Sequence, residues 1–187
     1  MAGLRRSLHF VPGANERMLE KALGLPADAL ILDLEDAVAP GRKDEARRVL
    51  RGWLDAVDFG GREVVVRANP LDTPWGPADL EALLAGRPPA ALLVPKVRAA
   101  RDLQMLHELL LALERGAGLP EGGVELIVIA TETPEGALAV TELARGPRVT
   151  GLTWGAEDLS AALGARRNRA AQGRYLPVFE HCRSRAL

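Results

Sequence analysis

The chain has 187 residues, with 24 basic and 25 acidic side chains and a formal net charge of −1. This balance gives no electrostatic reason to expect binding to nucleic acid or to a membrane surface. The one cysteine, Cys182, excludes an internal disulfide, and no apolar run reaches the roughly 18 residues that a membrane-spanning helix needs. Residues 1–7 are not followed by an apolar core of signal-peptide length. We therefore expect a cytoplasmic protein with a single domain over residues 1–187.

Short apolar runs alternate with amphipathic helical segments along the whole chain. Six runs predict β-strands: 7–11, 29–34, 63–68, 91–97, 124–131 and 149–154. Their nearly continuous apolar character is typical of parallel strands that are covered on both faces. Three helix N-caps are expected, the last two with a proline in the first turn: Asn15, Thr73 and Thr133.

The predicted strand ends recur at intervals of roughly 30 residues, as a repeated βα unit does. A closed (β/α)8 barrel usually takes about 250 residues, so this chain is short for one. An open, doubly wound sheet is the alternative. Because polar groups gather at the strand ends, we favour an α/β fold: a (β/α)8 TIM barrel of which about six βα units are present in this chain. This interpretation implies a barrel domain over residues 1–187 that lacks its last two strands and a C-terminal segment.

Two carboxylates follow neighbouring predicted strands. Glu132 comes after the fifth apolar run and Asp158 after the sixth. If these strands are parallel neighbours, both side chains lie at the same edge of the sheet, where bare carboxylates ~4 Å apart would repel by ~4 kcal/mol at an effective dielectric near 20. A hard divalent cation with oxygen ligands would relieve that repulsion. The sequence thus predicts a magnesium-type site on Glu132 and Asp158. The alternative is that either residue caps the helix that follows it.

An arginine and two acids follow the third and second predicted strands. Arg67 ends an apolar run, where a permanent guanidinium charge is suited to polarising a carbonyl or stabilising an oxyanion. We expect Arg67 to be catalytic and to bind substrate. The alternative is an ion pair with Glu35 or Asp36 that orders this edge of the sheet. We place Glu35 and Asp36 in the catalytic site too, orienting metal waters or holding Arg67, with a general-base role left open.

Four further features are ambiguous. Phe10 begins a small-residue turn that would let backbone amides approach an anionic group, although an ordinary strand–helix turn also explains it. Lys96 either meets the metal-site carboxylates and substrate or forms a structural salt bridge. His9 lies inside a strand and is expected in the core. The basic run 166–169 is typical of a solvated face, although it could also contact nucleotide phosphates.

Together these segments resemble the citrate lyase β-subunit-like branch of the HpcH/HpaI aldolase superfamily. The resemblance covers nearly the whole chain in unbroken order. Its matching segments are RSLHFVPGAN (6–15), LDLEDAV (32–38), RANP (67–70), LVPKV (93–97), ETP (132–134) and GAEDL (155–159).

The resemblance implies a Mg2+-dependent lyase that makes or breaks carbon–carbon bonds in 3-hydroxy-acyl thioesters of coenzyme A or an acyl carrier protein, with a 2-oxo acid as the other reactant. It also implies a homo-oligomeric barrel, as a trimer or hexamer. Glu132 and Asp158 match the metal ligands, Arg67 the substrate-binding arginine, and Glu35 and Asp36 an acidic pair near the metal. The backbone amides of Ala156, Glu157 and Asp158 match a site for the oxo-acid carboxylate.

Three other functions stay open. A pyruvate aldolase acting on free hydroxy-oxo acids would use the same metal pair, but such enzymes favour a histidine base, and none of the three histidines follows a predicted strand. A non-catalytic, truncated paralogue or interaction subunit is the second. A phosphoenolpyruvate-type barrel enzyme is the third.

Overall fold

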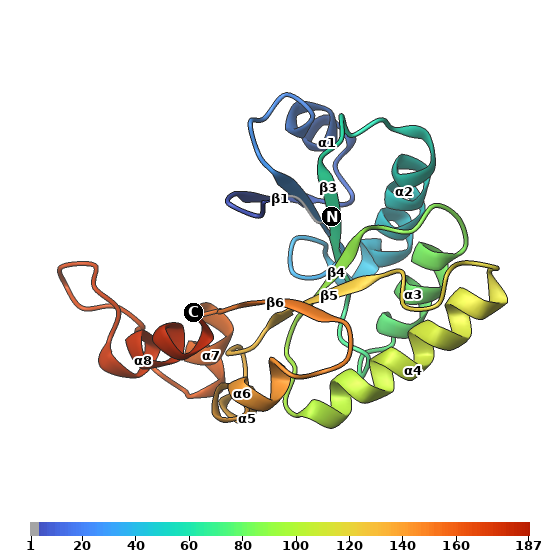
Figure 1. Ribbon diagram of the computed structural model, residues 1–187. Helices are drawn as coiled ribbons and strands as arrows, with labels where there is room; N and C mark the ends of the chain where they lie inside the picture. The colour runs from blue at the N-terminus through green and yellow to red at the C-terminus, as the bar shows by residue number, and fades with distance from the viewer. Residues whose placement is uncertain (1–3) are drawn as a thin grey trace. The chain divides into compact units, whose positions relative to one another are not determined.

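The computed structural model describes residues 4–187 and alternates strands with helices throughout (Figure 1). The elements, in chain order, are β1 (Leu8–Pro12), α1 (Glu16–Ala22), β2 (Ala29–Asp33), the 3-10 helix η1 (Pro40–Arg42), α2 (Lys43–Ala56), β3 (Glu63–Arg67), α3 (Gly76–Leu84), β4 (Ala91–Val94), α4 (Ala100–Gly116), β5 (Glu125–Ile129), α5 (Pro134–Leu138), α6 (Val140–Leu143), β6 (Val149–Thr153), α7 (Glu157–Ala162) and α8 (Pro177–Ala186). The predicted α/β class and all six predicted strands are confirmed. Residues 1–3, part of the start on which the expected lack of a signal peptide rests, lie outside the described residues.

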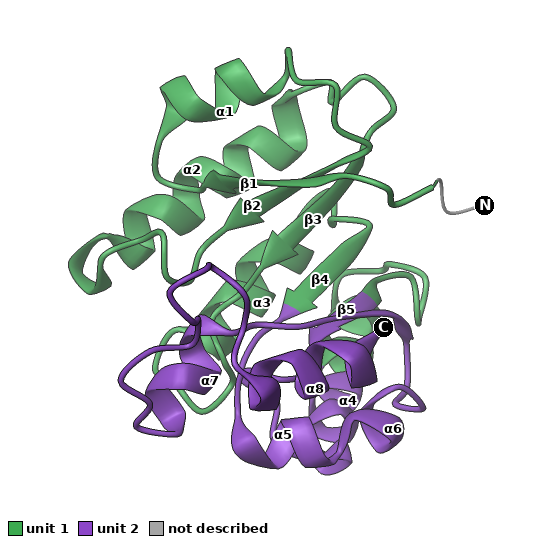
Figure 2. Ribbon diagram, turned by 90° about the vertical axis from the view of Figure 1, so that its left-hand side faces the viewer, with its two compact units in different colours: residues 1–93, 110–125 green, residues 94–109, 126–187 purple. Residues whose placement is uncertain are grey.

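The chain forms two compact units (Figure 2). The first comprises residues 1–93 and 110–125, and the second comprises residues 94–109 and 126–187. Throughout residues 4–187, no helix combines the length and the apolar character needed to cross a bilayer.

Within the first unit, β1 to β4 are parallel neighbours in chain order. All five residues of β2 are buried. Helix α2 buries Ala46, Leu50 and Leu54, which recur every four residues and are at most 3% exposed. Burying a leucine side chain stabilises a fold by about 1.5–3 kcal/mol. The tightly covered β2 therefore gives a rigid base to the residues that follow it.

The turn after β1 needs a glycine. A Cβ atom on Gly13 would lie 2.8 Å from the carbonyl oxygen of Asp33, and the Gly13 amide donates a 2.8 Å hydrogen bond to that oxygen. Close backbone approach therefore explains the small residue here, as expected for an ordinary strand–helix turn.

Strand β1 is less covered than we expected. Leu8 and Phe10 are 36% and 45% exposed, and His9 is exposed instead of lying in the core. Successive strand residues point to opposite faces of a sheet, so neither face of this part of β1 is covered. The prediction of a core histidine is wrong because it assumed that both faces were covered.

Within the second unit, β5 and β6 are parallel neighbours, with Ile129 paired to Thr153. Both strand ends therefore lie at one edge, as the sequence predicted. A small core gathers α7 and α8 beside the end of β6. It consists of Ala137, Ala156, Leu159, Phe179 and Cys182, with Trp154, Tyr175 and Leu176 packed against them.

Two of the three predicted N-caps are confirmed. The Asn15 side chain accepts the Met18 amide, and the Thr133 hydroxyl oxygen accepts the Gly136 amide. Thr73 is not the N-cap residue itself, because α3 begins at Gly76 and Trp75 occupies that position, but its hydroxyl oxygen accepts the Gly76 amide at 3.3 Å. Thr73 also closes the turn before the helix, donating from its amide and its hydroxyl to the carbonyl oxygen of Pro70.

Candidate functional site

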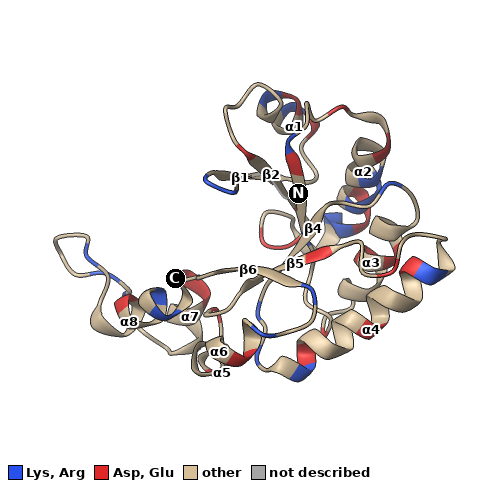
Figure 3. Cartoon of the chain, in the orientation of Figure 1, with Lys and Arg blue, Asp and Glu red and all other residues tan. Residues whose placement is uncertain are grey.

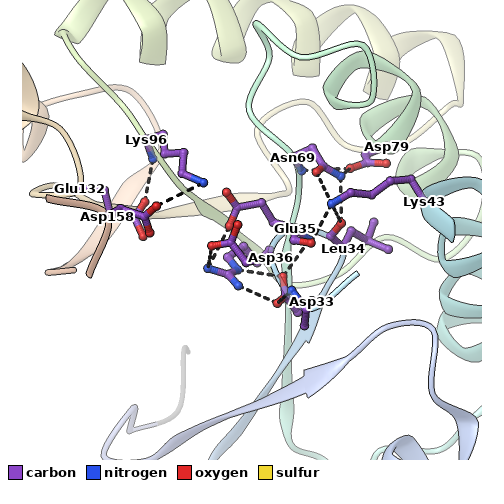
Figure 4. Close-up of polar contacts among 12 residues, drawn as sticks. Asp33, Leu34, Glu35, Asp36, Lys43, Asn69, Asp79, Lys96, Glu132 and Asp158 are labelled. Carbon is purple, nitrogen blue, oxygen red and sulfur yellow. Dashed lines mark hydrogen bonds and ion pairs between the residues drawn. The ribbon is translucent and has the colours of Figure 1, made fainter. Parts of the chain in front are cut away.

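Arg67 is the last residue of β3, and Asp33, the last residue of β2, is its register partner. Its Nε donates to Asp33 Oδ1 at 2.8 Å and its Nη2 to Asp33 Oδ2 at 2.6 Å (Figure 4). Such a two-point ion pair fixes the plane of the guanidinium as well as its position. We did not single out Asp33 from the sequence, although a charged residue closing an otherwise apolar run was the signal for it.

The third guanidinium nitrogen of Arg67 faces the predicted acidic pair. Its Nη1 lies 2.9 Å from Glu35 Oε2 and 3.6 Å from Asp36 Oδ2. The Glu35 side chain is 4% exposed and the Asp36 side chain 53%. The structure thus contains the ion pairs of the alternative interpretation. Burial alone would lower the pKa of Arg67, but the hydrogen bonds and charge of Asp33, with the charges of Glu35 and Asp36, outweigh it and raise that pKa.

Phe10 also lies against this guanidinium, with its ring centroid 5.1 Å from Arg67 Cζ. This cation–π contact brings the predicted substrate-binding residue Phe10 to the same place as Arg67.

A buried lysine holds the segment that carries the acids. The Lys43 ammonium donates three bonds of 2.7 Å, to the carbonyl oxygens of Leu34 and Glu35 and to Asn69 Oδ1 (Figure 4). The side-chain amide of Asn69 in turn donates from Nδ2 to Asp79 Oδ2 at 2.6 Å. Burial lowers the pKa of Lys43, and the negative charge of Glu35 opposes this. The sequence gave no signal for Lys43, because it lies at the start of a helix among other charged residues.

The predicted metal residues both contact Lys96. The Lys96 amide donates to Glu132 Oε2 at 2.9 Å, and its Nζ lies 3.6 Å from Asp158 Oδ1 (Figure 4). Lys96 has a φ of 55°, a left-handed conformation that costs a non-glycine residue roughly 1–3 kcal/mol. This strained backbone directs the amide to one carboxylate while the side chain reaches the other. Neither acid is an N-cap, since Thr133 caps α5 and Ala156 occupies that position in α7.

These groups fit a magnesium ion. Glu132 is 5% exposed and accepts from the neutral backbone amide of Lys96, whereas the Lys96 ammonium lies 3.6 Å from Asp158. Two carboxylates therefore stand beside one cationic side chain, which leaves net negative charge. Gly155 allows Glu132 to pack closely against the backbone, because a Cβ on Gly155 would lie 2.6 Å from Glu132 Cγ. Within residues 4–187, no three His, Cys, Asp or Glu side chains form a metal-binding group. Mg2+ suits a site of one or two carboxylates, since it keeps several waters or substrate oxygens.

Ala156, Glu157 and Asp158 form the start of α7. Ala156 is 7% exposed, and Glu157 Oε1 accepts a 2.9 Å hydrogen bond from Asn168 Nδ2. The first amides of a helix have no partner within the helix, so the predicted anion-binding amides stand beside Asp158.

Comparison with known proteins identifies the family. Residues 6–184 match the family described as HpcH/HpaI aldolase/citrate lyase. The chain is 44% identical over 161 residues to a (3S)-malyl-CoA thioesterase of Cereibacter sphaeroides, covering 86% of this chain and 52% of that protein. It is 38% identical over 179 residues to the citrate lyase subunit beta of Escherichia coli K12, covering 95% of this chain and 58% of that subunit. The chain thus spans a little over half the length of these relatives.

Solved structures of CitE from Mycobacterium tuberculosis have the same fold. One, in complex with magnesium and acetoacetate, has a TM-score of 0.80 at 34% identity and covers 98% of this chain and 69% of that one. Another, with magnesium, acetoacetate and coenzyme A, has a TM-score of 0.77 at 35% identity and covers 98% of this chain and 61% of that one. The predicted resemblance to the citrate lyase β-subunit-like branch is confirmed. The chain belongs to the HpcH/HpaI aldolase/citrate lyase family.

Proposed function

We propose that this chain carries the catalytic site of a Mg2+-dependent carbon–carbon lyase. Its substrate is a 3-hydroxy-acyl thioester of the citryl-, malyl- or citramalyl-CoA type, and its products are an acetyl-type thioester and a 2-oxo acid. The names of the matched relatives support a thioester substrate, and magnesium, acetoacetate and coenzyme A in the CitE complexes support the cofactor and both halves of the substrate.

Glu132 and Asp158 are the proposed metal ligands. The observation that carries this proposal is that both carboxylates, which follow neighbouring parallel strands, contact the same residue, Lys96. Magnesium bound there would act as a Lewis acid on the oxygen that becomes the keto group of the 2-oxo acid. The amides of Ala156, Glu157 and Asp158 donate to the carboxylate of the oxo-acid half.

Arg67 is the proposed anion-stabilising residue. Asp33 holds two of its nitrogens, which leaves Nη1 directed to Glu35 and to the half-exposed Asp36. The 3.6 Å contact to Asp36 is the one that a substrate anion displaces most easily. Glu35 then keeps the guanidinium oriented, and Asp36 is released to hold water or take up a proton. Phe10 and Lys96 complete the proposed substrate contacts.

The bond changes balance without a further reactant. The 3-hydroxyl group loses its proton, the C2–C3 bond breaks, and its electron pair moves onto the thioester as an enolate. The former hydroxyl oxygen becomes the keto oxygen of the 2-oxo acid, and the enolate takes up a proton at C2. Arg67 stabilises the negative charge on the oxygen as the bond breaks.

An Arg67→Ala variant tests this assignment. Removing one donor to an oxyanion costs about 2.7–4 kcal/mol, or about 100- to 1000-fold in kcat. We expect that loss in cleavage of malyl-, citryl- or citramalyl-CoA, with Mg2+ affinity retained. Full activity in the variant would remove Arg67 from the mechanism.

Two measurements test two of the three other functions, the pyruvate aldolase and the non-catalytic paralogue. Cleavage of free hydroxy-oxo acids in preference to CoA thioesters would identify a pyruvate aldolase. Absence of Mg2+-dependent binding of oxaloacetate or pyruvate would identify a non-catalytic paralogue. The homo-oligomeric state, as a trimer or hexamer, is also a proposal, and sedimentation of the purified protein measures it.

A further inference from the structure

A cavity of about 210 Å3 lies within the first unit, at the amino ends of β3 and β4. Arg62, Glu63 and Val64 line it where β3 begins, and Ala90 lines it directly before β4. The candidate catalytic site lies at the other end of the same strand, where Arg67 is about 13 Å along β3 from Glu63. The cavity is therefore distinct from that site.

One wall of the cavity is apolar. Leu54 comes from the last turn of α2, Phe59 from the loop that follows and Val64 from β3, and all three are buried. Pro88 extends this wall from the loop before β4. An apolar cavity of about 150 Å3 takes up benzene, which has about six non-hydrogen atoms, so the cavity here suits roughly eight. The lining thus favours a small ligand with an apolar part.

Arg87 lines the same cavity and is fixed through its backbone. Its amide donates to Asp55 Oδ1 at 3.0 Å, and its carbonyl oxygen accepts Arg51 Nη2 at 2.7 Å. The Asp55 carboxylate is itself bound by the Arg51 guanidinium, at 2.6 and 3.0 Å, which lowers the pKa of Asp55. Arg87 is exposed, and its guanidinium has no hydrogen-bond or ion-pair partner among residues 4–187. Its donors are thus available to a ligand.

Arg62 places a second guanidinium in the lining. Its Nη1 donates to the Phe59 carbonyl oxygen at 3.2 Å, and its side chain forms no ion pair within the described part of the chain. Glu63 is bound elsewhere, because Arg5 donates to its two carboxylate oxygens at 2.7 and 2.6 Å. Basic and acidic residues are interspersed along α2 (Figure 3), so no general excess of positive charge explains the two arginines.

We propose that this cavity binds a small linear carboxylate, with its apolar chain on the buried wall and its charge on Arg62 and Arg87. Guanidinium groups match a carboxylate with paired donors, and an anion relieves the repulsion between two cations that share one cavity. A chain of about six carbons suits the volume, because hexanoate has about eight non-hydrogen atoms. The site lies away from the catalytic residues and stands whether or not the lyase proposal holds.

Titration calorimetry of hexanoate into the wild type, Arg87→Gln and a control, Arg17→Gln, tests the proposal. Arg17 is likewise exposed and belongs to α1 in the same unit, but it does not line the cavity. We expect Arg87→Gln to bind hexanoate at least about fivefold more weakly, because it loses charge-assisted hydrogen bonds, and the control to match the wild type. Equal hexanoate affinity in Arg87→Gln and the wild type would overturn the proposal, and so would a wild type that does not bind hexanoate at millimolar concentrations.

A ligand series tests both parts of the site in the unaltered protein. Each buried methylene group strengthens binding by up to about fourfold, so affinity should rise from acetate through butanoate to hexanoate. Hexanol lacks the charge and inorganic phosphate lacks the apolar chain, so both should bind more weakly than hexanoate. Phosphate binding as tightly as hexanoate would indicate a simple anion site, and hexanol doing so would indicate a simple apolar one. Either result would overturn the proposal.

Competition separates this cavity from the candidate catalytic site. Pyruvate with Mg2+ is the probe for the catalytic site, and a saturating amount should leave hexanoate affinity unchanged. Displacement of hexanoate by pyruvate and Mg2+ would place hexanoate at the catalytic site and contradict the assignment to the cavity. Failure of the lyase proposal gives a different result, in which no CoA thioester is cleaved while hexanoate binding still depends on Arg87.

Discussion

Asp33 and Arg67 end neighbouring parallel strands as register partners and form a two-point ion pair of 2.8 and 2.6 Å. Their side chains are 2% and 12% exposed. Removing one partner of such a pair leaves the other charge largely buried without its counter-charge. The resulting loss of stability is larger than the net stability that the intact ion pair contributes. The ion pair therefore orients Arg67 and makes the fold depend on Asp33.

An Asp33→Asn substitution should destabilise the protein by about 3 kcal/mol, within the range for breaking a buried ion pair. Urea unfolding monitored by circular dichroism measures the loss. Asp44→Asn is the matched control, because Asp44 also pairs with an arginine, Arg47, at 2.7 Å but its side chain is 86% exposed. We expect that exposed pair to contribute under about 1 kcal/mol. Equal effects of the two substitutions would contradict a special role for Asp33.

A Lys43→Met substitution should destabilise the protein and also disturb the acidic pair. It removes the donor shared by the carbonyl oxygens of Leu34 and Glu35 and by Asn69 Oδ1. The Leu34 carbonyl keeps its 3.0 Å hydrogen bond from Asn69 Nδ2, and a buried group left unsatisfied costs about 1–3 kcal/mol. Turnover should fall together with the free energy of unfolding. A variant that unfolds at the wild-type urea concentration would show that these bonds contribute nothing net.

A Gly155→Ala substitution should weaken Mg2+ binding. The added methyl group would lie 2.6 Å from Glu132 Cγ, so this buried carboxylate must move. Gly52→Ala, within helix α2, is the control, since nothing lies within 4 Å of its Cβ position. We expect the control to be up to about 1 kcal/mol more stable than the wild type, from helix propensity alone. Calorimetric titration with Mg2+ in the presence of pyruvate compares the two variants. Unchanged Mg2+ affinity in Gly155→Ala would show that Glu132 is not a metal ligand.

Stability should depend on the Asp28 carboxylate in acid. Its hydrogen bonds with the Arg6 guanidinium lower the pKa of Asp28 to about 2, from about 3.9 in an unfolded chain. A folded-state pKa below the unfolded value adds stability that is complete above about pH 4 and is lost as pH falls through about 2. The stability difference between wild type and Asp28→Asn should thus shrink from pH 5 to pH 2 in urea unfolding. A constant difference over that range would show that the pair does not form in solution.

The strands were predictable because each buried strand is an apolar run of the right length, as Ala29–Asp33 illustrates. Whether other elements cover a strand was not predictable, since Leu8 and Phe10 in β1 have the same apolar character but are exposed. The start of α3 was placed too early, because Thr73 lies in the turn before the helix and α3 begins at Gly76. A Cβ on Gly76 would collide with the Pro70 carbonyl, so only glycine fits at this first helical position.

Some residues of the candidate site were predictable from the sequence and others were not. The sequence pointed to the carboxylates in the segments after β5 and β6, because parallel strands bring their ends to one edge. The partners that orient the charged groups, Asp33 and Lys43, were missed. Their importance comes from contacts between residues far apart in the chain, such as Lys43 with Asn69, and no local pattern records those contacts.

The most direct measurement is calorimetric titration of Mg2+, with pyruvate or oxaloacetate present, into the wild type, Glu132→Gln and Asp158→Asn. We predict binding to the wild type and at least about tenfold weaker binding to each variant, because each loses one of only two carboxylate ligands. Asp36→Asn should retain Mg2+ binding, since Asp36 contacts Arg67 and is not a proposed ligand. Unchanged Mg2+ affinity in both Glu132→Gln and Asp158→Asn would contradict the proposed metal site and the lyase chemistry built on it.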